Sequence, residues 1–600
     1  MMDKTGWRRF AALMMLAAAL LLPFLGLTPF NTKGEPREAV VALSMLQSDN
    51  WVLPVNNGGD VAYKPPLFHW SIALLSEALG NGHVSEYLAR LPSALALLAM
   101  IAGGYRLYGR RKGWGVALVM GLLTLTNFET HRAGTNCRVD MLLTACMVGA
   151  LYLLYVAHER KRAWMYAAAM LCMSGAMLTK GPVGIVLPCA VGLVYELMRG
   201  SERPWRTWAR YVGLGLGALV LPALWYAAAY AQGGDAFWAL VWEENVLRFT
   251  GQMSYGSHEN PAIYNVIMLL AGMLPYTLLV LMGLAIAPWR RWWNARSGIL
   301  KPLTTGTWWR QKWQHLRRAD GLQLFSALAF VIIFVFYCIP KSKRGVYLLP
   351  VYPFVCYFLA TYLMTLWQRR STLVKLFGQV VAALAATASV AAVVLRFVPL
   401  PETWLKGSDG AALAALHSAP WTLWSVIGIG LPLGLAIAYF NGSRRTPTAP
   451  WTFYGALLLP YSVLLALNCH YQPTLLSGRS DKWVAQKVAE RFPAGHVHTY
   501  IYMPDYHISS KMHYFTLNFY LADRIRPYEE ELPQEGGYVI MGEADYAQHF
   551  QPQFGEDFDI RLVTDYHHRS CDTRQNLGLY RFTPHAGSES AATAQKAAAN

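Results

Sequence analysis

Long apolar runs separated by short polar segments make up the chain from about residue 10 to residue 470. Each run is roughly 20 residues long, the length of helix that crosses a bilayer core about 30 Å thick. The runs are apolar on every face, unlike the one-sided stripe of a surface helix in a soluble protein. The pattern predicts an α-helical polytopic membrane protein with about 13 transmembrane helices. These spans begin near residues 10, 88, 114, 139, 163, 182, 208, 263, 321, 345, 374, 420 and 451.

The loop between the first two spans, residues 31–87, is long and not simply polar. Residues 35–47 have the spacing of an amphipathic helix, and the apolar segment 66–79 is too short to span, which favours a helix lying in the interface. Lys64 stands directly before two prolines at the start of that second helix. We interpret it as a fixed cation at the membrane surface that suits a lipid phosphate, with an ordinary interfacial lysine as the alternative.

The pattern changes after residue 470. A helical segment at 481–491 is followed by strand-like runs at 496–503, 517–521, 538–541, 561–564 and 578–582. The chain ends in an Ala/Ser-rich stretch that is typical of disorder. We therefore predict three parts: a membrane domain at 1–470, a small periplasmic α/β domain at 471–585 and a tail at 586–600.

Charge supports this topology and gives it a direction. Hydrophobic residues make up 54% of the chain and charged residues 14%, while the net charge is +17. The lysines and arginines gather in alternate loops, as expected for loops that remain in the cytoplasm. These loops contain residues 106–112, 160–162, 199–210, 290–318, 367–375 and 444–445. The positive charge therefore indicates membrane orientation and anionic lipids rather than nucleic acid, with a cytoplasmic N-terminus and an uncleaved first span in the bacterial inner membrane.

Several short motifs occur in an order typical of one enzyme superfamily. They are Gly34–Trp70, Ala89–Ala94, Arg138–Asp140, Leu178–Pro182, Pro222–Tyr226, Glu243–Phe249, His258–Pro261 and Lys341–Pro350. Together they resemble the GT-C glycosyltransferases that include the bacterial lipid A aminoarabinose transferases and the dolichyl-phosphate-mannose protein mannosyltransferases. The resemblance covers about residues 10–370, and the matched loops are expected on the outer side of the membrane.

The resemblance implies a GT-C fold and a sugar donor carried on a polyprenyl (undecaprenyl) phosphate. Cleavage of a sugar–phosphate bond leaves negative charge on the phosphate, so cations should surround it and a carboxylate should lie near the sugar. We expect donor-phosphate binding by Lys64, Lys341, Lys343 and Arg344. We expect the catalytic carboxylates to be Asp140, at the start of a span, and Glu35. Ion pairing of Asp140 and a helix-dipole role for Glu35 are the alternatives.

Further positions match the family without a role that their chemistry alone assigns. Arg90, Lys180, Arg248, His258 and Asp60 are possible substrate-binding residues. The lipid A transferases carry an acidic residue before the Lys-Pro pair, where this chain has Tyr63. We therefore expect no certain cofactor, and a divalent metal only if Asp60 takes the place of that acid.

A departure in the first motif bears on the acceptor. Relatives often have an acidic pair where this chain has Gly34 and Glu35. A hydroxyl acceptor needs a base to remove its proton, whereas a phosphate is already anionic near neutral pH. We therefore predict transfer to a lipid A phosphate. Transfer to a protein hydroxyl or another envelope glycan, and transport of lipid-linked sugars without catalysis, remain the alternatives.

Overall fold

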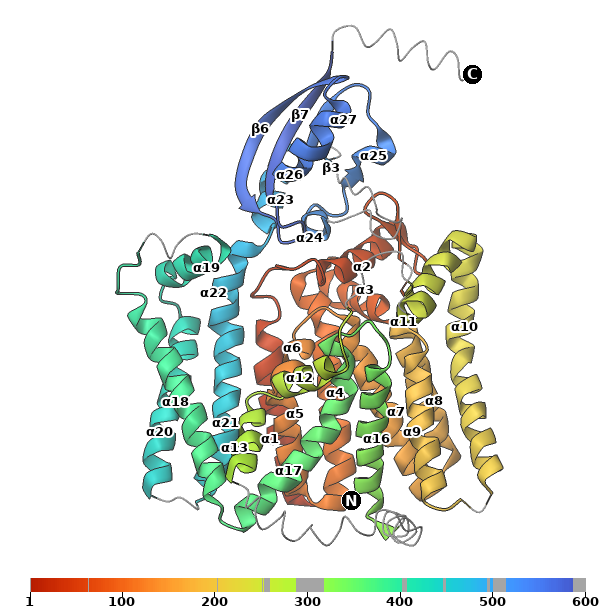
Figure 1. Ribbon diagram of the computed structural model, residues 1–600, viewed down its shortest axis with the longest axis vertical. Coiled ribbons are helices and arrows are strands. Elements are labelled where there is room, and N and C mark those ends of the chain that lie inside the picture. Colours follow the sequence, from red (N-terminus) through yellow and green to blue (C-terminus); the bar gives the residue numbers. More distant parts are fainter. Residues whose placement is uncertain are drawn as a thin grey trace.

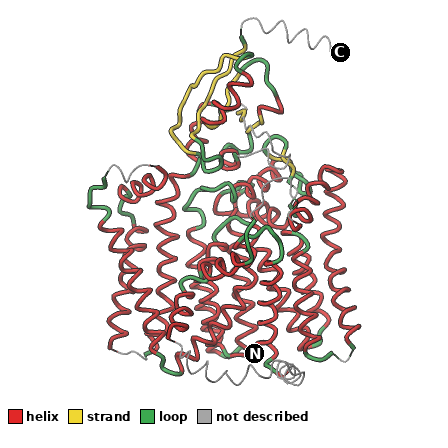
Figure 2. The backbone as a smooth tube through the Cα atoms, in the orientation of Figure 1, coloured by secondary structure: helices red, strands yellow, loops and turns green. Residues whose placement is uncertain are grey.

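The computed structural model describes residues 2–585 except 63, 202, 251, 253–258, 287–317, 402–406, 446–448, 494–496 and 500–513. A bundle of long helices forms most of the molecule, and a small sheet stands on one end of it (Figure 1). We call this the sheet end. The strands are concentrated there, whereas the bundle is almost entirely helical (Figure 2). The N-terminus lies at the opposite end of the bundle (Figure 1).

Nine of the described helices are long and apolar enough to cross a membrane. They are α1 (Lys4–Leu21), α4 (Glu86–Lys112), α7 (Val139–Arg160), α10 (Pro204–Trp242), α16 (Gly321–Cys338), α17 (Tyr352–Gln368), α18 (Thr372–Val394), α20 (Leu423–Arg445) and α21 (Pro450–Ala466). Other apolar helices in the bundle are α5 (Trp114–Thr126), α8 (Ala163–Lys180), α9 (Val183–Met198) and the bent pair α12 (Ile263–Gly272) and α13 (Tyr276–Ile286). Every span expected from the sequence begins at or near one of these helices, and the polytopic helical fold is confirmed.

Side-chain caps fix where several of these helices begin. Ser85 Oγ accepts a hydrogen bond from Leu88 N at the start of α4, at 3.3 Å. Asn127 Oδ1 does the same for Thr130 N in the short helix α6 (Phe128–Gly134), at 3.0 Å. Such caps satisfy amide groups that have no partner inside the helix. They set the level in the membrane at which α4 and the α6–α7 turn present their polar residues.

The first outer loop folds as its pattern predicts. It contains α2 (Pro36–Ser48), a two-residue antiparallel pair of β1 (Val55–Asn56) and β2 (Asp60–Val61), and α3 (Leu67–Gly80). The prolines suit the starts of both helices, since the first helical amide has no partner to lose. The apolar faces of α2 and α3 share one small core over the bundle.

The sheet has five strands in the order β4-β3-β5-β7-β6. These strands are β3 (Val497–Thr499), β4 (Ile525–Pro527), β5 (Gly537–Gly542), β6 (Phe558–Arg569) and β7 (Asn576–Pro584). The first three run parallel, and β7 joins β5 to β6 in antiparallel fashion. The expected helix at 481–491 is present as α23 (Lys482–Arg491). The division at residue 470 stays a prediction, because the last membrane helix continues to Arg479.

One expected strand is wrong. Residues 517–521 belong to a short helix, α24 (Phe515–Tyr520). Leu517 and Leu521, four residues apart, are both fully buried in the core of the sheet domain. A helical turn places residues at this spacing on one face, and tertiary packing overrides the strand preference of Phe and Tyr.

Helix α24 joins the sheet domain to the first outer loop. The Asn518 side-chain amide donates to Asn57 Oδ1 and to Asp523 Oδ1, the latter at 2.7 Å. Asp523 Oδ1 also accepts from Asn57 N at 2.8 Å. Tyr520 OH donates to Glu86 at the start of α4 at 2.9 Å. These contacts place the sheet domain directly over α2 and α3 (Figure 1).

Candidate active site

Glu38 is the centre of a charged cluster on the first outer loop. It lies on α2 and is 2% exposed. Its carboxylate accepts from His69 Nε2 on α3 at 2.9 Å and from Arg37 at 3.1 Å, and it pairs with Lys64 Nζ. Burial alone would raise its pKa, but the neighbouring Lys64, Arg37 and His69 hold the pKa well below the usual range. Glu38 is therefore a carboxylate at neutral pH.

Lys64 is held in a partly buried position. Burial and the neighbouring Arg37 lower its pKa to about 8, although Glu38 acts in the opposite direction. The ammonium is therefore protonated at neutral pH, but it loses its proton more readily than an exposed lysine. It is close to a carboxylate and still a quarter exposed, so it can also reach an anion from the membrane side.

Asp140 forms a second carboxylate position beside Glu38. It lies in the first turn of α7, is 6% exposed and pairs with Lys180 Nζ at the end of α8. Lys180 Nζ lies 4.4 Å from the centre of the Tyr347 ring. Tyr347 belongs to the segment that follows Arg344, so Lys180 connects two of the sequence motifs. Arg138, two residues before Asp140, packs against Gly34, so the start of α7 lies against the loop that precedes Glu38.

Four arginines converge on this site from separate elements. We call Arg37, Arg138, Arg248 and Arg344 the cation cluster. Burial lowers the pKa of Arg344, and the charges of Arg248, Arg37 and Arg138 lower it further. Arg37 pairs with Glu38 and Arg248 with Glu244, whereas Arg138 and Arg344 have no ion pair within the described part of the chain. The site therefore contains half-buried positive charge for which the described residues supply too few carboxylates.

The segment before Arg344 is held by backbone contacts. Ser342 bridges to Glu259, and Asn260 N donates to Lys341 O at 3.3 Å. Lys343 is 5% exposed and donates to the carbonyl of Pro340. Lys341 is exposed. Of the three expected phosphate ligands here, Lys343 and Arg344 are thus turned into the protein and Lys341 faces outward.

Gly34 explains how Arg138 reaches the site. A Cβ atom on Gly34 would lie 1.9 Å from an Arg138 guanidinium nitrogen. The arginine therefore occupies the space that a side chain at position 34 would need. The chain has an arginine against its backbone where relatives often have the first acid of a pair.

Glu35 has a different environment from Glu38. It forms a two-point ion pair with Arg90 at 2.8 and 3.0 Å, and it accepts from Cys137 N at 2.8 Å. Arg90 also donates to the carbonyls of Leu25 and Thr28 at 2.7 and 2.6 Å. Burial opposes ionisation of Glu35, but the pKa is lowered because Arg90 outweighs that effect. All of these contacts are within the protein, which favours a structural role for both residues.

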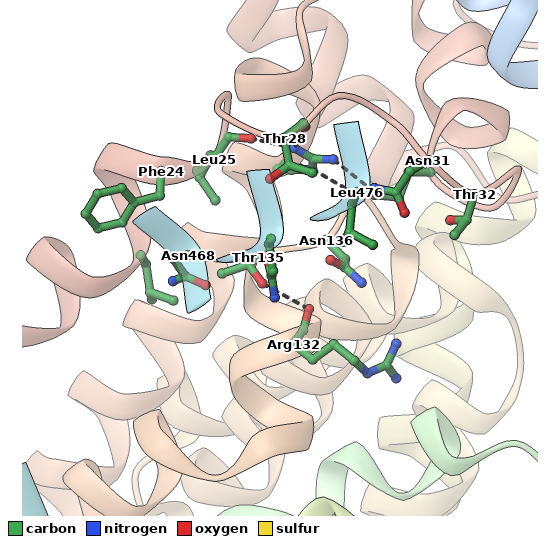
Figure 3. A pocket seen from close by; sticks show the side chains of 14 residues that line it. Phe24, Leu25, Thr28, Asn31, Thr32, Arg132, Thr135, Asn136, Asn468 and Leu476 are labelled. Carbon is green, nitrogen blue, oxygen red and sulfur yellow. Dashed lines mark hydrogen bonds and ion pairs between the residues drawn. The ribbon is translucent and has the colours of Figure 1, made fainter. Parts of the chain in front are cut away.

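A separate polar cavity of about 200 Å³ lies on the other side of this ion pair. Its walls carry amides and hydroxyls, as Figure 3 shows for Asn31, Thr32, Thr135, Asn136 and Asn468. These groups come from the loop before α2, the α6–α7 turn and the last membrane helix. Glu35, Arg90 and Arg132 also line the cavity, so it offers charged groups as well as amides and hydroxyls that both donate and accept.

Two expected residues cannot be placed. His258 lies outside the described residues, as does the side chain of Asp60, which belongs to β2. Tyr63 is also outside them. The divalent metal considered at Asp60 therefore stays a prediction.

One group of metal-type ligands occurs among the described residues, in the sheet domain. It comprises Asp481, Cys571 and Asp572. Asp481 already accepts from His568 at 2.8 Å and Ser570 at 2.7 Å. Burial and the adjacent Asp481 raise the pKa of Asp572 well above its usual range. Asp572 is therefore protonated, which removes the repulsion between these two adjacent carboxyl groups.

Sequence reasoning missed Glu38, His69, Arg37 and Arg138. Glu38 and Arg37 lie inside the first motif, but the periodicity of α2 does not separate a carboxylate facing the site from one on the solvent side. The buried, apolar surroundings of His69 gave no sign of a polar partner. The available signal was the alternation of charge in Arg37-Glu38, two opposite charges at the start of an otherwise apolar helix.

The solved structure of ArnT from Cupriavidus metallidurans bound to undecaprenyl phosphate has a similar fold. It superposes with a TM-score of 0.67 and 19% sequence identity, covering 96% of this chain and 98% of that one. The chain has the GT-C fold. Beyond the superposition, the GT-C resemblance appears in the sequence: the profile of the family dolichyl-phosphate-mannose-protein mannosyltransferase matches residues 63–226.

Similar GT-C proteins carry names that state an activity. An undecaprenyl phosphate-α-4-amino-4-deoxy-L-arabinose arabinosyl transferase of Shewanella sediminis is 27% identical over 63% of this chain and 64% of its own length. A protein of the same name from Edwardsiella ictaluri is 24% identical over 77% of this chain and 76% of its own. The match thus spans less than two thirds of the Shewanella protein. The resemblance to the superfamily is confirmed, and the chain is a multi-pass inner-membrane protein.

Proposed function

We propose that this protein is a glycosyltransferase that moves a sugar from a polyprenyl phosphate to an acceptor at the outer face of the inner membrane. The observation that carries the proposal is the cation cluster together with Lys64 and Lys180, which pair with the carboxylates of Glu38 and Asp140. A phosphodiester donor carries the negative charge that Arg138 and Arg344 lack among the described residues. The names of the Shewanella and Edwardsiella relatives specify a donor of this class.

The reaction needs charge stabilisation more than new covalent chemistry. The bond between the sugar C1 and the phosphate oxygen breaks as an acceptor oxygen bonds to C1, and the polyprenyl phosphate leaves with the electron pair. Fixed cations stabilise the charge that grows on that leaving group. The carboxylates of Glu38 and Asp140 stabilise positive character at C1. We assign Glu38 and Asp140 to this role in place of Glu35, because Arg90 holds both carboxylate oxygens of Glu35.

The acceptor we propose is a phosphate of lipid A. An anionic phosphate oxygen attacks without a base, which fits a site whose carboxylates are held by cations. A protein hydroxyl is the second candidate, favoured by the match to the protein mannosyltransferase family at residues 63–226.

The orientation belongs to the same proposal. We place the sheet end in the periplasm and the N-terminus in the cytoplasm, because the described basic turns at residues 106–112, 160–162 and 444–445 lie at the end opposite the sheet. The donor phosphate then reaches the site from the outer leaflet.

Mass spectrometry of lipid A from cells with and without the gene tests the function. We expect a sugar-sized mass on the lipid A phosphates to disappear in the deletion strain and to return with the wild-type gene. Asp140→Asn should not restore it, and Lys341→Gln should restore most of it. Unchanged lipid A together with loss of sugar from a periplasmic protein would replace the lipid acceptor by a protein acceptor.

A further inference from the structure

A second charged cavity lies at the end of the bundle opposite the sheet. It has a volume of about 1100 Å³ and lies between the α7–α8 turn and the loop from α9 to α10. Those helices stand together at one side of the bundle (Figure 1). Its charged lining residues are His158, Lys161, Glu196, Arg199, Arg203, Arg206 and Arg210. No part of the candidate active site borders it.

Cations outnumber carboxylates in this cavity. Glu196 is the one carboxylate among its described lining residues, and it is 4% exposed. Its oxygens accept from Arg210 at 2.8 Å and from Tyr211 at 2.9 Å, with His158 Nδ1 at 3.3 Å. Residues of the cavity wall therefore occupy both carboxylate oxygens of Glu196. Its charge is thus neutralised within the wall, and the lining keeps an excess of cations over carboxylates.

Arg203 and Arg206 lie at the mouth, around the start of α10. Both are exposed and have no ion pair within the described chain, where Glu202 is not included. Arg203 is the N-cap of α10 but gives no side-chain cap, and the first turn contains no acid. Ser201 and Thr207, the nearby hydroxyls, bond to each other at 2.8 Å. These hydroxyls therefore bond within the protein, and the positive charge at the mouth comes from the two arginine side chains.

Aromatic side chains place this mouth at the level of lipid headgroups. Trp164, Trp205 and Trp208 are 59%, 66% and 60% exposed. Tryptophan collects at membrane–water interfaces, where its ring is apolar and its N–H is polar. All three lie in the first turns of α8 and α10, next to the cavity. An anion entering there would come from the membrane surface.

We propose that this cavity binds the phosphate headgroup of an anionic phospholipid from the leaflet opposite the active site. Basic pockets between membrane helices bind such headgroups through charge-assisted hydrogen bonds. Inorganic phosphate has the same binding chemistry, but a soluble ion gains nothing from the exposed tryptophans. The lipid is a constituent of the folded protein and takes no part in sugar transfer.

Native mass spectrometry of the purified full-length protein in detergent tests this site. The probes are diphosphatidylglycerol, phosphatidylglycerol and the zwitterionic phosphatidylethanolamine. The variant is R203Q/R206Q, and the matched control is R444Q/R445Q, which removes two exposed arginines from the same end at α20. A nearby Lys or Arg strengthens attachment to anionic lipid roughly fivefold. We expect the retained anionic lipid to bind about thirtyfold more weakly to R203Q/R206Q, from two such contributions, and the control to bind as the wild type does.

Three results would overturn the proposal. Equal loss in both double variants would mean a general charge effect of this face. Equal retention of phosphatidylethanolamine would remove the headgroup specificity. Displacement of the lipid by an equal concentration of inorganic phosphate would assign the cavity to the free ion. Thermal unfolding of the lipid-free variants must match that of the wild type, which separates loss of binding from loss of fold.

Discussion

Glu35 and Glu38 are three residues apart and have opposite surroundings. Glu35 is enclosed by Arg90 and backbone amide groups, so its charge fastens the loop before α2 to α4. Glu38 contacts Lys64 and His69, which border the site. We therefore propose that the first carboxylate serves the fold and that the second takes part in the reaction.

Substitution by glutamine separates these two roles. Glu35→Gln leaves the buried Arg90 charge without a partner, which costs about 3–5 kcal/mol of unfolding free energy. We expect a large fall in thermal stability and in the yield of folded protein. Glu38→Gln should keep the yield and lower the transfer rate by about 10²–10³-fold, through loss of electrostatic stabilisation.

Thermal unfolding in detergent and single-turnover transfer measure the two effects. Arg90→Lys is the control for Glu35, since it keeps the charge but not the two-point contact. A stable but inactive Glu35→Gln protein would contradict the structural role and indicate that Glu35 is a catalytic carboxylate.

The lowered pKa of Lys64 predicts that transfer activity declines at high pH. Its pKa is lowered to about 8, so the free enzyme loses this cation as the pH rises through 8. We expect kcat/KM for the donor to fall above that pH, because kcat/KM reports groups of the free enzyme. Below it, the ammonium is fully present and this limb of the profile is flat.

The pH–rate profile of Lys64→Arg checks the assignment. Arginine stays charged to far higher pH, so the limb near pH 8 should disappear even if overall activity is reduced. If the fall in rate near pH 8 is unchanged in Lys64→Arg, a group other than Lys64 causes it.

At the scale of elements, α24 is the joint between the sheet domain and the active-site loop. The Asn518 side chain connects Asn57 and Asp523, and its own Oδ1 accepts from Ile525 N at 3.1 Å. Three of the four hydrogen-bonding positions of this amide are thus filled, and the bond to Asn57 crosses the joint. Loss of the side chain leaves several buried partners unsatisfied.

Asn518→Ala should therefore loosen the domain from the loop. We expect a loss of about 2–4 kcal/mol, from two or more unsatisfied groups at about 1–3 kcal/mol each. Transfer activity should fall along with it, because α2 lies under α24. Amide hydrogen exchange of residues 36–48 measures the loosening, with Asn576→Ala, an exposed site on β7, as the control. Unchanged exchange in α2 would mean that the domain is dispensable for the order of the loop.

The sequence predicted the elements far better than their contacts. Long apolar runs, α2 and α3 followed from residue spacing alone, since each period is local. Residues 517–521 did not, because the choice between strand and helix was made by packing against residues far along the chain. The candidate site followed the same rule: Asp140 and Arg344 were predicted from their motifs, whereas the contact of His69 with Glu38 depends on the placement of α3 against α2.

On the scale of the whole molecule, the two ends of the bundle both carry positive charge, but in different arrangements. The sheet end has the cation cluster for a transient anionic substrate, and the opposite end has basic turns and the lipid cavity. The described part of the chain thus carries two positively charged regions with different tasks. Only the positive charge at the end opposite the sheet follows from the rule that cytoplasmic loops carry an excess of lysine and arginine.

Labelling from either side of the membrane tests the orientation of the whole molecule. The eight native cysteines are all buried or half-buried. Glu556→Cys in the sheet domain and Arg445→Cys at the end of α20 both add exposed thiols. We expect a membrane-impermeant maleimide to label the first in intact spheroplasts and the second only after lysis. The reverse pattern would invert the topology and remove the proposed periplasmic acceptor.

The convergence of Arg37, Arg138, Arg248 and Arg344 has a consequence for turnover. The proposed donor is a phosphodiester with one negative charge, whereas the polyprenyl phosphate left after transfer would be a monoester with a charge of about −1.5 to −2 at neutral pH. A site that holds the donor through positive charge therefore holds the spent carrier more tightly. On the proposed function, we expect departure of the carrier rather than bond cleavage to limit the rate of the cycle, and accumulated carrier to inhibit sugar transfer competitively.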